Sequence, residues 1–121
     1  MRSRTIRVIA VVKDLFFVAR IRETARLAGA VASFARTPEE LEAALGDAPD
    51  LVLLDLTTRD WNYDAFFATL EARMPPVPVL GFTTHALARD TQHLHSRCTR
   101  VVTRETLTQE LGRFLTEGIA A

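Results

Sequence analysis

The chain has 121 residues, of which 48% are hydrophobic and 25% charged, a composition typical of one globular domain and unlike that of a disordered chain. Fifteen basic and fifteen acidic side chains balance, so no net field favours a nucleic acid or a membrane surface as a partner. The single cysteine, Cys98, excludes a disulfide framework and a cysteine metal cluster, and we expect a cytoplasmic, single-domain protein over residues 1–121.

The first half of the chain predicts two strands, each followed by a helix. Residues 5–12 are rich in β-branched side chains, as in a strand, and this apolar run is too short for a signal peptide or a membrane span. A segment of helical period follows and ends at Gly29, an expected C-cap. After a weaker strand over residues 30–35, Thr37 and Glu40 predict a capping box at the start of a second helix.

The second half begins with residues 51–56, whose near-unbroken apolarity predicts a strand buried on both faces. The elements expected next are a helix over residues 64–73, a strand over 77–82, a polar helix over 86–95 and a brief strand over 100–102. Helical spacing predicts that Met74 packs inward at the end of the first of these helices. A last helix is expected to open with a second capping box, formed by Thr106 and Gln109.

Five strands that alternate with five helices predict an α/β fold, a parallel sheet with helices on both faces. In such open sheets, ligands gather beyond the carboxyl ends of the strands. Asp55 lies near the carboxyl end of the third strand, in the run DLVLLDL. A buried carboxylate is unfavourable unless it is paired or hydrogen-bonded, so Asp55 is the first candidate for a functional residue.

Three segments of the chain carry a resemblance to a known family. PDLVLLDL contains Asp55, VPVLGFTTHA contains Thr83, and RETLTQEL begins with Arg104. In this order they resemble the response-regulator receiver domain, the phosphoacceptor module of two-component signalling, over essentially the whole chain. The resemblance implies a flavodoxin-like (βα)5 three-layer sandwich with a five-stranded parallel sheet of order 2-1-3-4-5. It implies that Asp55 is the phosphoacceptor and Thr83 the hydroxyl switch, and that Arg104 replaces the family's lysine.

The expected metal site departs from the family's pattern. Receivers of this family hold Mg²⁺ with the phosphoacceptor and a pair of acids after the first strand, but the pair here is Lys13 and Asp14. Two alternatives follow: Asp14 and Asp55 hold Mg²⁺ with the help of water, or Lys13 takes the place of the ion. In the second alternative, Asp55 pairs with Lys13 or Arg104. We expect no resident cofactor, and Mg²⁺ only where phosphorylation is retained.

Two further departures separate the chain from the standard receiver. Val101 stands where the family has an aromatic switch on the fifth strand, and the loop TTRDWNYD after Asp55 lacks the usual proline and glycine. The chain therefore resembles a divergent, single-domain branch that we call pseudo-receivers. In that loop, Trp61 and Tyr63 either cover the edge of the core or anchor a partner.

Two functions remain open after this comparison of residues. One is a signalling module that acts through protein contact, with phosphotransfer lost or reduced. The other is a functioning receiver that a histidine kinase phosphorylates on Asp55, and in neither case do we expect an enzyme beyond autophosphorylation. A small flavodoxin-like enzyme or nucleotide-binding protein is disfavoured, because the segment VVKDLFF after the first strand has no glycine to admit a phosphate.

The partner is expected to be a protein, either a histidine kinase or a downstream effector, and a homodimer is the alternative. In the family, the usual interaction face is formed by the fourth helix, the fifth strand and the fifth helix. That face would be basic in this chain, through Arg89, His93, Arg97, Arg100 and Arg113. Phe16 lies off the buried helical face and is a second candidate for a partner surface.

Overall fold

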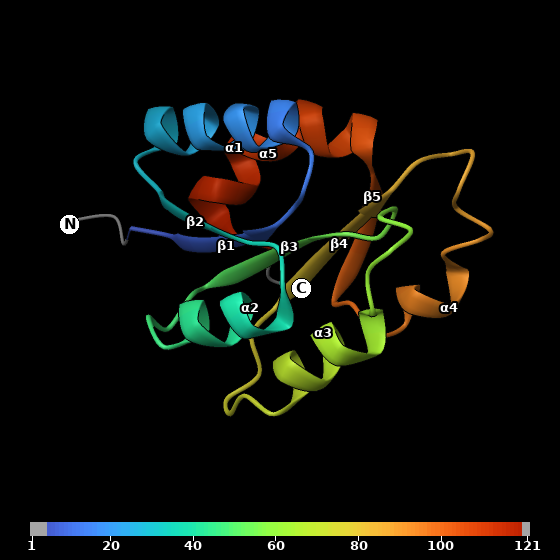
Figure 1. The fold of residues 1–121 in the computed structure, drawn as a ribbon. Coiled ribbons are helices and arrows are strands. Elements are labelled where there is room, and N and C mark those ends of the chain that lie inside the picture. The colour runs from blue at the N-terminus through green and yellow to red at the C-terminus, as the bar shows by residue number, and fades with distance from the viewer. Residues whose placement is uncertain (1–4, 120–121) are drawn as a thin grey trace.

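A computed structural model describes residues 5–119 of the chain, in which one parallel sheet lies between two layers of helices (Figure 1). The strand order is β2-β1-β3-β4-β5. The strands are β1 (Arg7–Val11), β2 (Val31–Ala35), β3 (Leu51–Asp55), β4 (Val79–Thr83) and β5 (Arg100–Thr103). The helices are α1 (Leu15–Ala28), α2 (Pro38–Leu45), α3 (Tyr63–Glu71), α4 (Gln92–His95) and α5 (Arg104–Glu117). This architecture confirms the predicted flavodoxin-like sandwich and its strand order.

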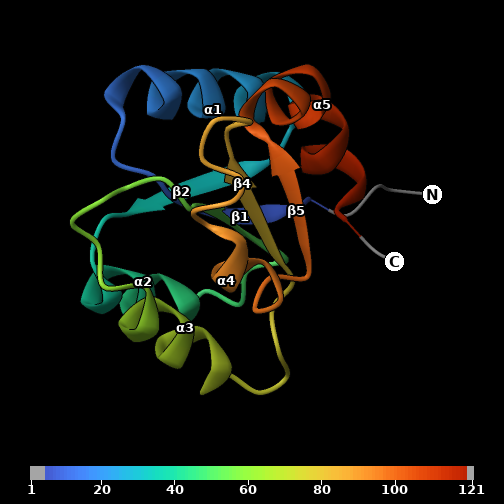
Figure 2. The same ribbon diagram turned by 90° about the vertical axis from the view of Figure 1, so that its right-hand side faces the viewer.

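The two helical layers are divided unequally between the faces of the sheet. Helices α1 and α5 cover one face, and α2, α3 and α4 cover the other (Figure 1, Figure 2). Alternation along β3 sends Leu51 and Leu53 to the first face and Val52 and Leu54 to the second. Because both faces are covered, the whole of β3 is buried, as its unbroken apolar sequence predicts.

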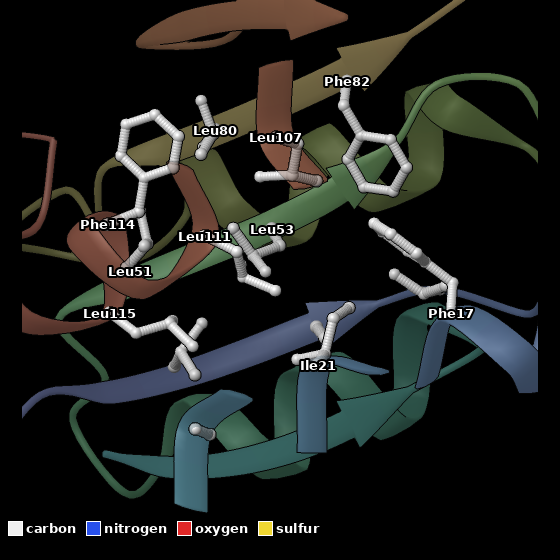
Figure 3. Packing of buried hydrophobic residues seen from close by; sticks show 14 of the residues in the cluster. Phe17, Ile21, Leu51, Leu53, Leu80, Phe82, Leu107, Leu111, Phe114 and Leu115 are labelled. Atoms are coloured by element: carbon white, nitrogen blue, oxygen red, sulfur yellow. The ribbon is translucent and has the colours of Figure 1, made fainter. Parts of the chain in front are cut away.

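The core under α1 and α5 is built from side chains that meet between the helices and the sheet (Figure 3). Ile21 is fully buried, and the ring of Phe17 lies 5.2 Å from that of Phe82, centroid to centroid. Burying one such side chain stabilises the fold by about 1.5–3 kcal/mol. The next residue toward the N-terminus, Phe16, is 91% exposed, as its place off the buried helical face predicts.

Capping residues fix the ends of the first two helices as expected. Gly29 follows α1 with φ 73°, a left-handed conformation that glycine adopts without strain. The hydroxyl of Thr37 accepts a hydrogen bond from the Glu40 N–H at 3.0 Å, which caps α2. The Glu40 carboxylate accepts from the N–H of Arg36 at 2.7 Å, one residue before the cap, so the predicted capping box is displaced by one position.

Three predictions about the second half are wrong. The predicted helix 86–95 is a series of turns that reaches helical form only in α4, and the hydroxyl of Thr91 donates there to the carbonyls of Leu87 and Ala88. Such local side-chain bonds compete with a regular helix. Helix α5 begins earlier than predicted, because Thr103 rather than Thr106 is its cap.

The third wrong prediction concerns Met74, which is 78% exposed. Helix α3 ends at Glu71, and Pro75 and Pro76 disfavour helical backbone in the residues that precede them. Met74 therefore lies beyond the helix, where the helical spacing no longer applies. Among residues 5–119, no helix is long and apolar enough to cross a membrane.

Candidate functional site

The predicted site residues meet at the edge of the sheet where the parallel strands end. Leu54 of β3 is in register with Val11 of β1, and Asp55 is in register with Phe82 of β4. Asp14 follows β1 and Arg104 follows β5 directly, so both reach the same edge. This is the edge at which ligands and chemistry gather in open α/β sheets.

Asp55 is held by its own loop and is only 4% exposed. Its Oδ1 accepts two hydrogen bonds from Thr57, one from the N–H at 2.8 Å and one from the hydroxyl at 2.6 Å. Its Oδ2 has no hydrogen-bond partner among the described residues. Since no buried side-chain oxygen in residues 5–119 lacks a partner, Oδ2 reaches solvent. One oxygen of Asp55 is therefore tied down and the other is accessible.

The loop after β3 is anchored to the backbone of Asp55 by Tyr63. The Tyr63 hydroxyl donates to the Asp55 carbonyl at 2.6 Å and accepts from the Thr58 N–H at 3.0 Å. Burial raises the pKa of Tyr63 to about 12. Trp61 packs on Phe66 with ring centroids 4.9 Å apart, so the loop aromatics cover the edge of the core.

Asp14 has both carboxylate oxygens engaged. Its Oδ1 accepts from the N–H groups of Phe16 at 2.9 Å and Phe17 at 3.3 Å, which caps α1. Its Oδ2 accepts from the guanidinium of Arg104 at 2.7 Å. The Arg104 hydrogen bond is the main cause that lowers the pKa of Asp14, and the backbone N–H groups add to it. The guanidinium also lies 4.6 Å from the centre of the Phe17 ring, which holds it against α1.

Lys13 pairs with a carboxylate other than that of Asp55. Its ammonium lies 3.2 Å from the carboxylate of Asp60, in the loop after β3, and both side chains are more than half exposed. Among residues 5–119, Asp55 forms no ion pair. The pairing of Asp55 with Lys13 or Arg104 is therefore wrong in this structure, because each cation has a different carboxylate as its partner.

Thr83 belongs to a network of hydroxyl groups on the face of the sheet opposite to α1 and α5. Alternation along β4 places it with Val79, beside the layer of α3 and α4. Its hydroxyl is hydrogen-bonded to that of Thr91 at 3.0 Å, and the Thr91 hydroxyl also lies 2.9 Å from Nε2 of His95. Thr84, not Thr83, caps the following turn by accepting from the N–H of Leu87 at 3.2 Å.

Among Asp14 and Asp55, only Asp55 keeps a carboxylate oxygen without a hydrogen-bond partner that a magnesium ion could use. Mg²⁺ requires oxygen ligands in near-octahedral geometry, usually one or two carboxylates and several waters. Asp14 offers no free oxygen, because the backbone of α1 and Arg104 use both. Lys13 places a cation where the family has a second acid. In the part of the chain that the structure describes, no group of three histidine, cysteine or acidic side chains could hold a metal.

Several partners of these residues were not predicted from the sequence. Thr57 donates a hydrogen bond to Asp55, and Asp60 forms an ion pair with Lys13. The hydroxyl of Thr91 is hydrogen-bonded to that of Thr83. Thr57 had a local signal, because a threonine two residues after an aspartate commonly forms such a turn. Asp60 and Thr91 had none, since their contacts depend on how distant loops pack.

The face of α4, β5 and α5 is less basic than predicted. Arg97 lies 2.9 Å from Asp64 and 3.2 Å from Glu71, and it stacks on Phe67 at 4.6 Å. Arg113 forms an ion pair with Glu110. Two of the five expected cations are therefore neutralised by carboxylates of α3 and α5.

Comparisons with known proteins find similar structures and no similar sequences. No family model and no curated protein matches the chain. The cyanobacterial phytochrome response regulator RcpA, solved in phosphorylated form, has a TM-score of 0.73 and 19% identity, over 97% of this chain and 98% of its own. Another similar structure is the receiver domain of the sensor histidine kinase PA1611 from Pseudomonas aeruginosa, solved with Mg²⁺ in its active-site cleft. It has a TM-score of 0.74 and 16% identity, over 93% of this chain and 95% of its own.

A third similar structure is a longer protein. NtrX from Brucella abortus has a TM-score of 0.75 and 16% identity over 94% of this chain, which spans only 27% of the NtrX chain. The strand order and the two helical layers agree with these likenesses. The chain has the fold of response-regulator receiver domains.

Proposed function

We propose that this protein is a receiver-like signalling module that acts by binding a partner protein, with phosphotransfer to Asp55 lost or much reduced. The observation that carries the proposal is the ion pair between Asp14 and Arg104, with 2.7 Å between Oδ2 and the guanidinium. It uses the one acid that remains of the pair with which the family holds its metal ion. Lys13, the other member of the pair position, carries the opposite charge.

The charges at the site explain why this arrangement opposes phosphorylation. A phosphoryl group on Asp55 would carry about two negative charges, about one more than the carboxylate it replaces, in a position that is nearly buried. In a receiver, a divalent cation and a lysine neutralise that charge. Here Arg104 forms an ion pair with Asp14, and Lys13 forms one with Asp60. Both ion pairs would have to break before these two cations could neutralise a phosphoryl group.

A functioning receiver is the second candidate, and one observation favours it. Oδ2 of Asp55 has no hydrogen-bond partner among the described residues and keeps some contact with solvent, so it is the oxygen that a phosphodonor would reach. Exposed ion pairs are weak, about 0.2–1 kcal/mol each, and a strong phosphodonor or a kinase surface could displace them.

Mass measurement separates these two candidates. The protein would be incubated with acetyl phosphate and Mg²⁺, and its intact mass compared with that of Asp55→Asn treated in the same way. The proposal predicts no phosphoryl adduct on either protein. An adduct on the unaltered protein that Asp55→Asn lacks would establish the functioning receiver instead.

We place the partner, a histidine kinase or a downstream effector, on the face of α4, β5 and α5. Arg89, His93 and Arg100 remain exposed there and have no carboxylate partner among residues 5–119. An acidic partner surface, or a second copy of the chain, would complement them. Sedimentation of the unaltered protein and of the Arg100→Glu variant tests whether a second copy binds this face. A dimer that Arg100→Glu dissociates supports the second copy. Monomers in both measurements support the acidic partner instead.

A further inference from the structure

A cavity separate from the Asp55 position lies at the carboxyl ends of β1 and β2. Its volume is about 460 Å³, within the range of small-molecule sites. Val12 and Lys13 after β1, Val18 and Arg22 of α1, and Phe34 and Arg36 of the β2 segment form most of its wall. Strand alternation explains the last pair: Phe34 packs against the α1 layer, and Arg36, two residues on, follows it to the same side.

Three cations and one acid line this cavity. Lys13, Arg22 and Arg36 line it together with Glu40, and Asp60 pairs with Lys13, so the local formal charge is +1 in a chain whose total charge is zero. The Glu40 carboxylate accepts a hydrogen bond from the backbone N–H of Arg36 at 2.7 Å, and this bond holds the acid at the start of α2. Glu40 forms no ion pair with the guanidinium of Arg36 among residues 5–119.

The two arginines of the cavity are among the described arginines that form no ion pair, as are Arg89 and Arg100. The arginines that form ion pairs with carboxylates are Arg26, Arg97, Arg104 and Arg113. Arg22 and Arg36 have no carboxylate partner among residues 5–119. Arg22 lies 4.9 Å from the centre of the Phe34 ring, which fixes its guanidinium at the cavity without using its hydrogen-bond donors.

We infer that this cavity binds a small organic phosphate. Guanidinium groups bind phosphate oxygens through paired N–H donors, and two of them match the two negative charges of a phosphate monoester. The cavity is much larger than an inorganic phosphate ion, and the partly exposed side chains of Val18 and Phe34 offer an apolar surface for the organic part of the ligand. The organic phosphate lies with its phosphate between Arg22 and Arg36 and its body against Phe34.

The test uses two organic phosphates, adenosine monophosphate and phenyl phosphate, in calorimetric titrations of the whole protein at low salt. Inorganic phosphate supplies the charge alone, and adenosine and phenol supply the ring alone. We expect saturable binding of at least one organic phosphate, binding of inorganic phosphate that is about tenfold weaker or more, and no binding of adenosine or phenol. Failure of both organic phosphates to bind, or equal binding of inorganic phosphate, would overturn the inference.

Charge-removing variants locate the binding site. Arg22→Gln and Arg36→Gln should each weaken binding about tenfold or more, because each removes one set of charge-assisted donors. Arg20→Gln is the matched control: it removes the same charge from the same helix, but Arg20 lines the groove between α1 and α5. Equal weakening by all three variants would show a nonspecific charge effect and contradict the proposed site.

A second measurement needs no variant and therefore does not depend on how the variants fold. Backbone amide resonances would be followed by NMR while the organic phosphate is added to the unaltered protein. The site predicts the largest shifts in residues 12–18 and 34–40, which surround the cavity. Shifts confined to other parts of the chain would place the ligand elsewhere and refute the inference.

Discussion

Asp14 and Arg104, 90 positions apart in the sequence, are joined by a hydrogen bond of 2.7 Å between carboxylate and guanidinium. The contact links the start of α1 to the start of α5 across the carboxyl edge of the sheet. A receiver needs an acid near this position for its metal ion, whereas this chain uses the acid to cap a helix and to hold an arginine. The same contact therefore contributes to stability and occupies the second carboxylate oxygen of Asp14.

Arg104→Gln should lower the free energy of unfolding by about 0.5–1.5 kcal/mol. The ion pair is partly exposed and so is worth little, but the guanidinium also loses its contact with the ring of Phe17. Urea unfolding at low and high salt measures the effect, and the loss should shrink as salt screens the pair. Arg20→Gln is the control for charge on the same surface, and an equal loss there would contradict a specific role for Arg104.

The lowered pKa of Asp14 predicts a pH dependence of stability. Folding lowers the pKa of this carboxyl below its ordinary value of 3.8, mainly through the Arg104 hydrogen bond. The resulting stabilisation is fully present above about pH 5 and is lost as the pH falls through the folded-state pKa. Asp14→Asn keeps a capping side chain but does not titrate, so its stability should fall less steeply between pH 5 and pH 3. Parallel curves for the two proteins would be inconsistent with this role of Asp14.

Tyr63 is the only tyrosine of the chain, so its titration can be followed directly by ultraviolet absorbance. Because burial raises its pKa to about 12, phenolate should form well above the ordinary value of 10.0 in the folded protein and near that value in denaturant. The raised pKa stabilises the fold below pH 10, and this contribution is lost as the pH rises toward 12. A folded-state titration near pH 10 would mean that the hydroxyl is not held in the loop.

Tyr63→Phe tests the structural role of the same hydroxyl. The variant leaves the carbonyl of Asp55 and the N–H of Thr58 without their partner. We expect a loss of about 1–2 kcal/mol in the free energy of unfolding, measured with urea. An unchanged midpoint would indicate that water satisfies both backbone groups at no cost.

Gly81 on β4 allows a close approach that no larger residue permits. A Cβ atom at this position would lie 2.7 Å from the sulfur of Cys98 and 3.0 Å from Cδ1 of Leu56. Gly81→Ala should therefore destabilise the protein by about 1–3 kcal/mol through overpacking. Calorimetric melting measures the loss, and Cys98→Ala in the same chain should recover part of it by removing the sulfur.

The matched control for that substitution is Gly112→Ala on α5. A Cβ atom at Gly112 meets nothing within 4 Å, and alanine favours a helix over glycine by about 0.5–1 kcal/mol. We expect Gly112→Ala to raise the melting temperature while Gly81→Ala lowers it. Similar effects from both substitutions would contradict the packing account of Gly81.

The fold was predictable because its signals are local and repeated. The apolar run at Leu51–Asp55, the cap at Thr37 and the C-cap at Gly29 each specify an element without reference to distant residues. Predictions failed where local bonds override periodicity. Residues 85–91 form turns in place of the expected helix, with the Thr91 hydroxyl bonded back to the carbonyls of Leu87 and Ala88, and the cap of α5 is Thr103 rather than Thr106.

The sequence predicts which residues lie at this edge of the sheet, but not which cation pairs with which carboxylate. Asp14, Asp55 and Arg104 follow from their positions after β1, in β3 and after β5. Which carboxylate meets which cation depends on the direction in which long, partly exposed side chains leave the backbone. Lys13 and Asp60 illustrate this, since they are 47 positions apart and their ammonium and carboxylate still lie 3.2 Å apart.

The central claim is that this carboxyl edge does not bind Mg²⁺, and the fluorescence of Trp61, the only tryptophan, tests it most directly. Mg²⁺ would be titrated into the unaltered protein, into Asp55→Asn and into the double variant Lys13→Asp/Arg104→Lys. The double variant restores the acid pair and frees Asp14 from the guanidinium. We predict no saturable change in the first two proteins and a saturable change in the double variant. A saturable change in the unaltered protein that Asp55→Asn abolishes would contradict the account.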